Sequence, residues 1–538
     1  MKHGSVRLLR LATLLVFAAA NRCVAQNRAP AARGDVARKS SRALPKSCLV
    51  QEHPSEQISV LLETIRDHAT AGAYNTLGAL YAQDSRVACA ISAFEAALRL
   101  DVQNWQSHYN LGLALLTKGD RTRAASEFQA AIRQKPDSVA CHFALGTLLQ
   151  EERKLDRALQ EFAAVLQLDP NFAPAYLSLG VLYTQQGKDL EATGLFRQAI
   201  QNDQKNVQAH VNLGLTMARL GEFSEAEQEF RSAIEIDPEN AEAYTSLGML
   251  EAKTGRGGEA VESFRKVVAL QPDSADAHLN LGIGLVDQYD RTTGFKEFTE
   301  AARLNPESPG VHYNLGHFFF ETGKYEEARK QLETAVRLQP NFASALYFLA
   351  LTERQDNRVE RAMELLQKVV VLQPDNADGQ YLLGQYLEGA GKTTDAIAHW
   401  KLALHADPNQ SEALYNLART LNKLHDPEAV QYQDRFDTLQ KNQQVTDRVG
   451  QLGNFAIQAA NAQNWPQALE QMKEALALCG RCGEAAHLHR NLGLMYCRTG
   501  NLKDGEKELQ AALDLDPNDA DAKKAISALQ NAHTANDK

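Results

Sequence analysis

The closest pair of cysteines in the chain is Cys479-Gly-Arg-Cys482, and His487, His489 and Cys497 follow it. In an exported protein, two cysteines at this spacing first indicate a disulfide. Thiolates and imidazoles are also ligands that zinc prefers, so the five residues form an alternative zinc cluster, although their spacing matches no standard zinc finger. We expect a disulfide between Cys479 and Cys482, and no bound metal.

Two other uses of this cysteine pair fit the sequence less well. A redox-active pair needs its first cysteine at a helix start, where the thiolate is stabilised, whereas Cys479 ends an expected helix. A c-type haem site needs histidine directly after the second cysteine, and Gly483 stands there. Cys48 and Cys89 are a second candidate pair, and Cys141 is expected to pack as a small apolar residue.

Catalytic patterns do not stand out from the rest of the sequence. We find no nucleophile beside a base, no phosphate loop and no pair of carboxylates with catalytic spacing. Acidic residues instead gather around prolines, as in Asp237-Pro238-Glu239, where they are typical of helix caps and turns. The formal net charge of −10 argues against nucleic acid as a partner. We therefore expect a protein that is not an enzyme and has no cofactor.

The elements that position these residues follow from a period of 34 residues. Glycine recurs at this interval, at Gly78, Gly112, Gly146, Gly180, Gly214, Gly248, Gly282, Gly316 and Gly384. Alanine takes its place at Ala350 and Ala418. A fixed period of this length indicates a solenoid, in which each unit is too small to bury its own apolar face and stacks on its neighbours.

Other positions keep the same register. Alanine follows most glycines after twelve residues, as at Ala124 and Ala158, and an aromatic residue follows that alanine after four, as at Phe128 and Phe162. Proline closes most units, as at Pro170, because its fixed φ and missing N–H end one helix before the next begins. Each unit is therefore predicted to be helix, turn, helix, turn.

This order of residues resembles the tetratricopeptide repeat (TPR) family, and the resemblance covers residues 71–444 without an insertion. The departures are Gln204 for a proline, Gly294 for an alanine, and a lost second-helix pattern near Val430 and Asp434. The resemblance implies an all-α fold, a right-handed superhelical TPR solenoid of antiparallel helix pairs. It also implies eleven units in this range, the last of them degenerate.

Shorter segments flank the eleven units. Residues 445–519 contain two further TPR-like units, after a slip in phase. Apolar residues at helical spacing predict capping helices within 55–70 and 520–538, the second followed by a short tail. We expect these helices to cover the two open ends of the stack.

The first 25 residues resemble a secretory signal peptide, with basic residues before an apolar run from Leu11 to Ala20. That run is too short to span a membrane. Residues 26–54 are expected to be a disordered basic linker. The protein is thus expected to be exported to the periplasm or outside the cell, with peripheral membrane association at most. A mitochondrial presequence is the alternative, against which the unbroken apolar core argues.

In TPR proteins the first helix of each unit lines a concave surface, and its sixth position is informative here. That position is asparagine in five units: Asn110, Asn212, Asn280, Asn314 and Asn416. An amide both donates and accepts, so it can pair with a peptide backbone without reading its side chains. The pattern partially resembles the asparagine ladder of the TPR superhelix of O-linked N-acetylglucosamine transferases, without their catalytic domain.

The fifth position of four consecutive units is tyrosine: Tyr313, Tyr347, Tyr381 and Tyr415. Tyrosines at this spacing predict an aromatic strip suited to extended peptides or sugars, and packing within the repeats is an equal contender. We expect a non-enzymatic scaffold in the cell envelope or secretory pathway that captures proteins or extended peptides in its groove. The alternative is a component of envelope polysaccharide assembly or export that binds glycan on the tyrosines.

Overall fold

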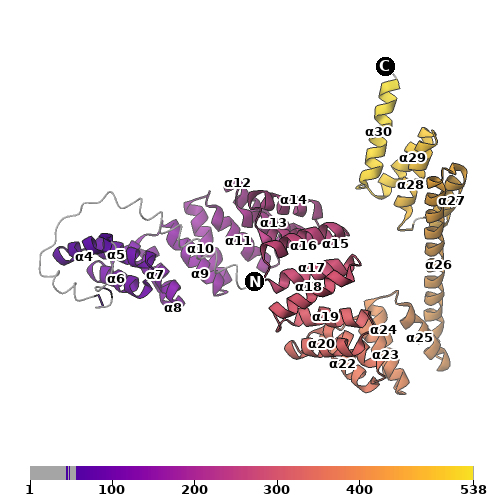
Figure 1. The fold of residues 1–538 in the computed structure, drawn as a ribbon, viewed down its shortest axis with the longest axis horizontal. Coiled ribbons are helices and arrows are strands. Elements are labelled where there is room, and N and C mark those ends of the chain that lie inside the picture. The colour runs from indigo at the N-terminus through magenta and orange to yellow at the C-terminus, as the bar shows by residue number, and fades with distance from the viewer. Residues whose placement is uncertain (1–43, 46–47, 49–55, 481, 537–538) are drawn as a thin grey trace. The chain divides into compact units, whose positions relative to one another are not determined.

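The computed structural model describes residues 44–45, 48, 56–480 and 482–536. The expected signal peptide and most of the expected linker lie outside these residues. The chain divides into two compact units, Met1–Leu304 (unit 1) and Asn305–Lys538 (unit 2). Throughout the described residues the regular elements are helices, so the predicted all-α fold is confirmed (Figure 1).

The described helices of unit 1 start with α4, after which they alternate as the first and second helices of successive repeats. They are α4 (Glu56–Asp67), α5 (Ala71–Gln83), α6 (Val87–Leu100), α7 (Trp105–Lys118), α8 (Arg121–Gln134), α9 (Val139–Glu151), α10 (Leu155–Leu168), α11 (Ala173–Gln185), α12 (Asp189–Asn202), α13 (Val207–Leu220), α14 (Phe223–Ile236), α15 (Ala241–Lys253), α16 (Gly257–Leu270), α17 (Ala275–Asp287) and α18 (Arg291–Leu304).

Unit 2 has the same alternation and ends with one further helix. Its helices are α19 (Pro309–Glu321), α20 (Tyr325–Leu338), α21 (Ala343–Gln355), α22 (Val359–Leu372), α23 (Ala377–Gly389), α24 (Thr393–Ala406), α25 (Ser411–Lys423), α26 (Glu428–Asn461), α27 (Trp465–Cys479), α28 (Ala485–Arg498), α29 (Leu502–Leu515) and α30 (Ala520–Asn536).

Polar side chains begin many of the first helices. Asn104 Oδ1 accepts a hydrogen bond from the Ser107 N–H over 2.8 Å, and Asn206 Oδ1 accepts one from the Ala209 N–H over 3.0 Å. These side chains satisfy amide groups that have no partner within the helix. The asparagines that precede first helices are therefore helix caps, distinct from the asparagines at the sixth position.

The turn inside each repeat has a left-handed residue at a fixed place. Glycine occupies it in several repeats, as at Gly119 (φ 91°) and Gly323 (φ 73°). Other residues take the same conformation at Ser85, Arg153, Tyr289, Asn357, His425 and Gln463. The turn is thus set by the repeat geometry even where the residue type disfavours it.

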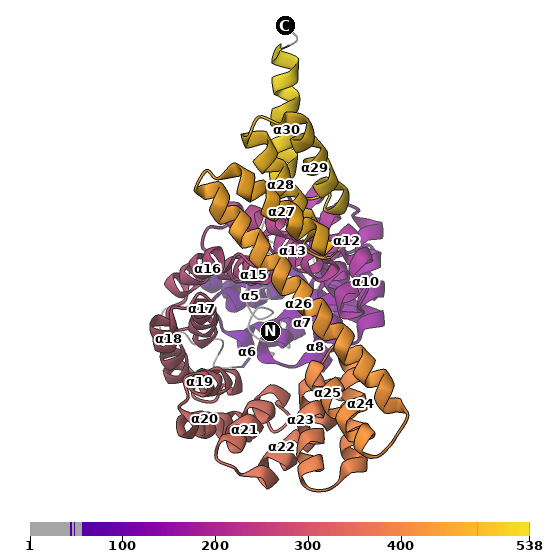
Figure 2. The ribbon, with the colours of Figure 1, turned by 90° about the vertical axis from the view of Figure 1, so that its right-hand side faces the viewer.

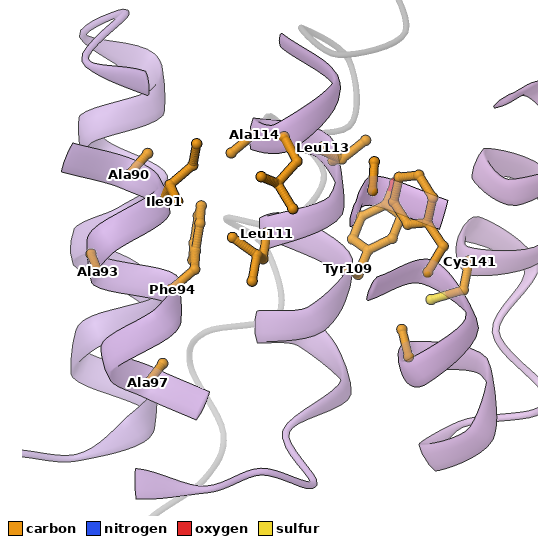
Figure 3. Close-up of a cluster of buried hydrophobic side chains, with 14 of the residues drawn as sticks. Ala90, Ile91, Ala93, Phe94, Ala97, Tyr109, Leu111, Leu113, Ala114 and Cys141 are labelled. Atoms are coloured by element: carbon orange, nitrogen blue, oxygen red, sulfur yellow. The ribbon is translucent and has the colours of Figure 1, made fainter. Parts of the chain in front are cut away.

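The core of each unit is built from the small and aromatic repeat positions. Phe94, Phe128 and Phe162 are fully buried on second helices, opposite the repeat glycines of the first helices. In Figure 3, Ile91 and Phe94 of α6 point towards Leu111 of α7, the first helix of the next repeat. Each repeat therefore completes its core with its neighbour.

The described residues that precede α5 are joined to the first repeat by a disulfide and by the packing of α4. Cys48 and Cys89 form the disulfide, with Cα atoms 5.5 Å apart, and Leu44 is buried in the same core. The hydroxyl of Tyr81 donates to the carbonyl oxygen of Cys48 over 2.5 Å. Cys48 is thereby fixed to the first repeat, while Ile58 of α4 is buried in the same cluster.

Helix α26 departs from the alternation. It is 34 residues long and appears in Figure 1 and Figure 2 as one unbroken helix between α25 and α27. Its first part packs Ala429 and Phe436 in one core, and its last part packs Val449 and Leu452 in another. Residues 440–448 between them are all exposed. The boundary predicted after residue 444 therefore falls inside a helix, because no turn separates the eleventh unit from the next.

Among the described residues, no helix combines the length with the apolar character that a membrane span requires.

Candidate functional site

Two hydrogen bonds show how the first helices of consecutive repeats lie. Asn110 on α7 donates from Nδ2 to Oδ1 of Asn75 on α5 over 3.0 Å. Asn416 on α25 donates from Nδ2 to the hydroxyl of Tyr381 on α23 over 3.5 Å. In both pairs the sixth position of one repeat meets the fifth position of the preceding repeat. These two positions therefore form a row of side chains across the first helices of each unit, which we call the first-helix strip.

The five asparagines of the strip differ in what their amides contact. Asn110 and Asn416 donate to the side chains just described, and Asn314 donates to the Gly310 carbonyl oxygen of its own helix over 2.9 Å. For Asn212 and Asn280 we find no side-chain hydrogen bond to any part of the chain that the structure describes. These two amides are therefore open to pair with a ligand without breaking an existing bond.

Aliphatic side chains stand one turn from these two asparagines. They are Leu215 on α13 and Ile283 on α17, and Met249 on α15 between them is 53% exposed. Ser246, at the sixth position of the repeat between the two asparagines, is 7% exposed. Unit 1 thus offers two separate amides beside an apolar row, with a buried serine between them.

The four tyrosines all lie in unit 2, on α19, α21, α23 and α25, but only one of them is open. Tyr415 is 47% exposed, and the guanidinium of Arg419 lies 5.8 Å from its ring centroid. Tyr313, Tyr347 and Tyr381 are half-buried. The tyrosines therefore form a row of residues in which three rings are partly covered by the protein.

Burial also governs the acidity of Tyr313, Tyr347 and Tyr381. Burial, and then the charge of Asp378, raise the pKa of Tyr347 to about 12. Burial likewise raises the pKa of Tyr313 and that of Tyr381, where Glu412 adds to the effect. These three phenols remain protonated at neutral pH, so they can donate hydrogen bonds to a ligand but supply no charge.

Phe348 is the centre of an aromatic cluster that the repeat pattern did not predict. Its ring centroid lies 4.3 Å from that of His317 and 6.0 Å from that of Tyr313. Phe320 and Tyr347 also contact it, with centroids 5.7 and 5.6 Å away. The unbroken run of aromatic residues from His317 to Phe320 is a signal that could have revealed the cluster. All five rings are partly exposed, so they offer an apolar surface on α19 and α21.

The cysteine and histidine residues near the C-terminus are not gathered into one metal site in the residues that the structure describes. Cys479 and Cys482 form a disulfide with Cα atoms 5.1 Å apart. His489 Nδ1 lies 2.6 Å from Glu508 Oε2, and His487 Nδ1 lies 3.3 Å from Glu484 Oε2. Cys497 is a free thiol, and burial raises its pKa. Each of the five residues considered for zinc thus either has another partner or lies apart from the others.

Three carboxylates that the sequence did not single out come together in unit 1. Glu227, Glu251 and Glu259 place oxygen atoms within 4.8 Å of one another, the only such group of potential metal ligands in the described parts of the chain. Arg256 donates to Glu227 and to Glu259, and Ser263 donates to Glu251 over 2.7 Å. Because an arginine already neutralises part of this group, we interpret it as a structural ion-pair network.

Comparison with known proteins identifies the repeat. The tetratricopeptide repeat family model matches most of the chain, in partly overlapping segments. These segments are residues 75–139, 143–207, 191–241, 211–275, 245–288, 313–377, 381–435 and 454–520. No curated protein sequence matches the chain.

Several solved structures are similar to parts of it. A tetratricopeptide repeat protein from Parabacteroides merdae ATCC 43184 is 19% identical, with 44% of this chain and 93% of that chain covered and a TM-score of 0.37. YrrB, described as a TPR protein with an unusual peptide-binding site, is 26% identical, with 35% and 96% covered and a TM-score of 0.30. A chain of the APC/C hetero-tetramer Cut9–Hcn1 is 16% identical, with 88% and 99% covered and a TM-score of 0.35.

The 34-residue register, the alternating helix pairs and the extent of the family match lead to one conclusion. This chain belongs to the tetratricopeptide repeat family.

Proposed function

We propose that the protein is a non-enzymatic scaffold of an exported compartment that captures extended peptide segments on the first-helix strip of unit 1. Tetratricopeptide repeats form scaffolds suited to binding proteins and peptides, and this chain carries them over most of its length. The finer assignment to one surface rests on the side chains of that surface.

The observation that carries the proposal is the pair of open amides at Asn212 and Asn280. Both occupy the sixth position of a first helix, two repeats apart, and both are partly exposed. An extended peptide has unpaired N–H and C=O groups along its length, and a side-chain amide can satisfy either kind. Because Asn212 and Asn280 occupy equivalent positions on α13 and α17, they suit a ligand that runs along the strip.

The free energies involved show that the neighbouring apolar side chains must also contribute to peptide binding. One hydrogen bond contributes about 1 kcal/mol net, and ordering a flexible peptide costs roughly 2 to 5 kcal/mol. Two amides alone would therefore not hold a peptide. Contact with Leu215, Met249 and Ile283 supplies further stabilisation, so we expect bound segments to place aliphatic side chains opposite these residues.

Both disulfides support the exported location. Cysteine pairs such as Cys48–Cys89 and Cys479–Cys482 persist in oxidising compartments and are rare in the cytosol. The signal-like segment at the N-terminus, which lies outside the described residues, is consistent with the same route.

A glycan on the tyrosine strip is the second candidate, and Tyr415 is the observation in its favour. A sugar ring stacks on an exposed aromatic ring, and Tyr415 is 47% exposed, with the Arg419 guanidinium over its ring. The other three tyrosines are half-buried, so this platform consists of one open ring. We therefore place peptide capture first.

A displayed library of linear peptides, selected against residues 26–538, tests the proposal. A photoreactive phenylalanine at Met249 on the first helix α15 should crosslink the enriched peptides. The same group at Leu190, which is 70% exposed on the second helix α12, is the matched control and should not crosslink them. Crosslinking only from position 190, or enrichment of no peptide at all, would contradict capture on this strip. Binding of a soluble oligosaccharide that is lost in Tyr415→Ala would favour the second candidate.

A further inference from the structure

Four histidines of unit 1 share one arrangement that repeats along the chain. Each lies on a first helix, four residues before the repeat glycine, and places Nδ1 2.6 Å from a glutamate oxygen on the second helix of the same repeat. The pairs are His108–Glu127, His142–Glu161, His210–Glu229 and His278–Glu297. We call each pair, with the carbonyl group described next, a histidine clamp.

The other ring nitrogen of each histidine faces a backbone carbonyl oxygen six residues earlier. This carbonyl belongs to the turn that closes the preceding repeat. The distances from Nε2 to the oxygen are 3.0 Å to Val102, 3.0 Å to Pro136, 3.4 Å to Gln204 and 2.9 Å to Pro272. Each clamp therefore ties together the two helices of one repeat and the end of the repeat before it.

The chemistry of the ring makes the clamp sensitive to protonation. A neutral imidazole has one N–H group, so it can donate to the glutamate or to the carbonyl, but not to both. Only the imidazolium ion donates to both acceptors. The side chains of His108, His210 and His278 are 12%, 11% and 11% exposed, so most of each ring is surrounded by protein.

The charges around His108 and His210 favour the protonated form. The hydrogen bond with Glu127 raises the pKa of His108 against the opposing effects of burial and of Arg133 on α8. The hydrogen bond with Glu229 on α14 likewise raises the pKa of His210 against burial. In both cases the carbonyl group of the preceding turn adds to the upward shift of the pKa.

The pKa of His278 is also raised, but by a different balance of opposing effects. Burial lowers its pKa, but the hydrogen bonds with Glu297 and with the Pro272 carbonyl act in the opposite sense. The charges of Glu297 and Glu300, both on α18, add to those bonds, so the net shift of the pKa is upward.

We propose that His108, His210 and His278 make the joints between repeats of unit 1 pH-sensitive: the joints are tight while the rings are protonated and loosen when the rings lose a proton. Each of these histidines stands two residues before an asparagine of the first-helix strip. Loosening a joint therefore loosens the relative positions of the strip residues on neighbouring repeats. The device itself does not depend on the proposed peptide binding, because it concerns the joints alone.

The direction of the effect follows from the upward shifts. A histidine whose pKa is higher in the folded state than its ordinary 6.5 contributes stability that is fully present below 6.5. That contribution is lost as the pH rises through the folded value. Unit 1 should therefore weaken on the alkaline side of its histidine titration.

Other repeats of the same chain show different versions of the clamp. Gln380 donates to the Pro374 carbonyl oxygen over 2.9 Å, and Tyr176 donates to the Pro170 carbonyl oxygen over 3.1 Å. In unit 2, His312 Nδ1 lies 2.7 Å from Oε1 of Gln331, where the clamps of unit 1 have glutamate. The fold thus accepts glutamine at the glutamate position, which makes Glu→Gln a conservative test.

The experiment compares the full chain with the triple variant Glu127→Gln, Glu229→Gln and Glu297→Gln. A control variant carries Glu225→Gln, Glu235→Gln and Glu242→Gln, which change the charge equally at exposed places in unit 1. Hydrogen exchange of α7, α13 and α17, corrected for intrinsic rates, is measured together with the melting temperature from about pH 6 to about pH 8.5.

The parent and the control variant should lose protection in these three helices, and melt earlier, as the pH rises. The triple variant should show a much smaller change. An equal pH dependence in the triple variant and the parent would overturn the proposal. If the triple variant does not fold, Glu229→Gln alone provides the same comparison at His210, with α13 as the readout.

Discussion

The ring of Phe128 on α8 lies directly on the backbone of Gly112 on α7, so that a Cβ atom added to Gly112 would stand 2.5 Å from Phe128 Cε1. A side chain at residue 112 would force this ring to move, which explains why this repeat position is glycine. Where alanine replaces the glycine at Ala350, leucine replaces the aromatic residue at Leu366. Residues 112 and 128 are therefore coupled through space.

Gly112→Ala should destabilise the protein by about 1 to 3 kcal/mol, because the extra methyl group overpacks the core. Adding Phe128→Leu should recover part of this loss by making room. Gly194→Ala is the matched control, since a Cβ atom there meets nothing within 4 Å; that change should stabilise its helix by roughly 0.5 to 1 kcal/mol. Denaturant unfolding measures all three. A Gly112→Ala protein as stable as the parent would refute the coupling.

Tyr289 is a second position at which a substitution has a clear sign. It has a φ of 63° in the turn between α17 and α18 and is 87% exposed, so its side chain gains little from packing. Tyr289→Gly should raise stability by about 1 kcal/mol, because the left-handed conformation strains a residue with a Cβ atom. Gly323→Ala, at the equivalent turn with φ 73°, should lower stability. Melting temperatures that move in the opposite directions would show that backbone strain does not govern these turns.

Glu251 gives unit 1 a pH dependence in the acid range. Burial raises its pKa above the ordinary 4.5, although the hydrogen bond from Ser263 opposes the shift. The folded protein therefore binds this proton more readily than the unfolded chain, and the contribution of Glu251 to stability should increase as the pH falls through the raised value towards 4.5. Glu251→Gln should remove this increase. The free energy of unfolding across this range checks the prediction, and an unchanged pH profile in the variant would exclude it.

The sequence was sufficient to predict the helical repeat, but not to predict which polar side chains have hydrogen-bond partners. The helix pairs followed from positions such as Gly112 and Phe128, because one period sets the packing of every repeat. Whether a strip asparagine is open depends on the partner that its own helix or the preceding repeat places beside it. Asn110 is occupied because Asn75 meets it, a contact between residues 35 positions apart. Such a contact is visible only once the neighbouring helices are placed.

Helix α26 shows a second limit of prediction from the sequence. The slip in phase beyond Asp426 indicated that the array changes there, but a loss of repeat register does not say whether the chain turns. Between Glu428 and Asn461 there is no proline to end a helix, so the backbone hydrogen bonds continue through the exposed residues 440–448. The absence of a residue that ends a helix was the signal for one long helix. The expectation of a turn in every repeat made this signal easy to miss.

The affinity of one selected peptide tests the central claim most directly. The dissociation constant is measured calorimetrically for the parent, for Asn212→Ala with Asn280→Ala, and for Asn110→Ala, whose amide is already bonded to Asn75. All three proteins must first show equal helicity and melting. Loss of two hydrogen bonds of about 1 kcal/mol each should weaken binding roughly 30-fold in the double variant, with little change in Asn110→Ala. Equal affinity in the double variant and the parent would show that the peptide is held elsewhere, and the assignment to the first-helix strip of unit 1 would fail.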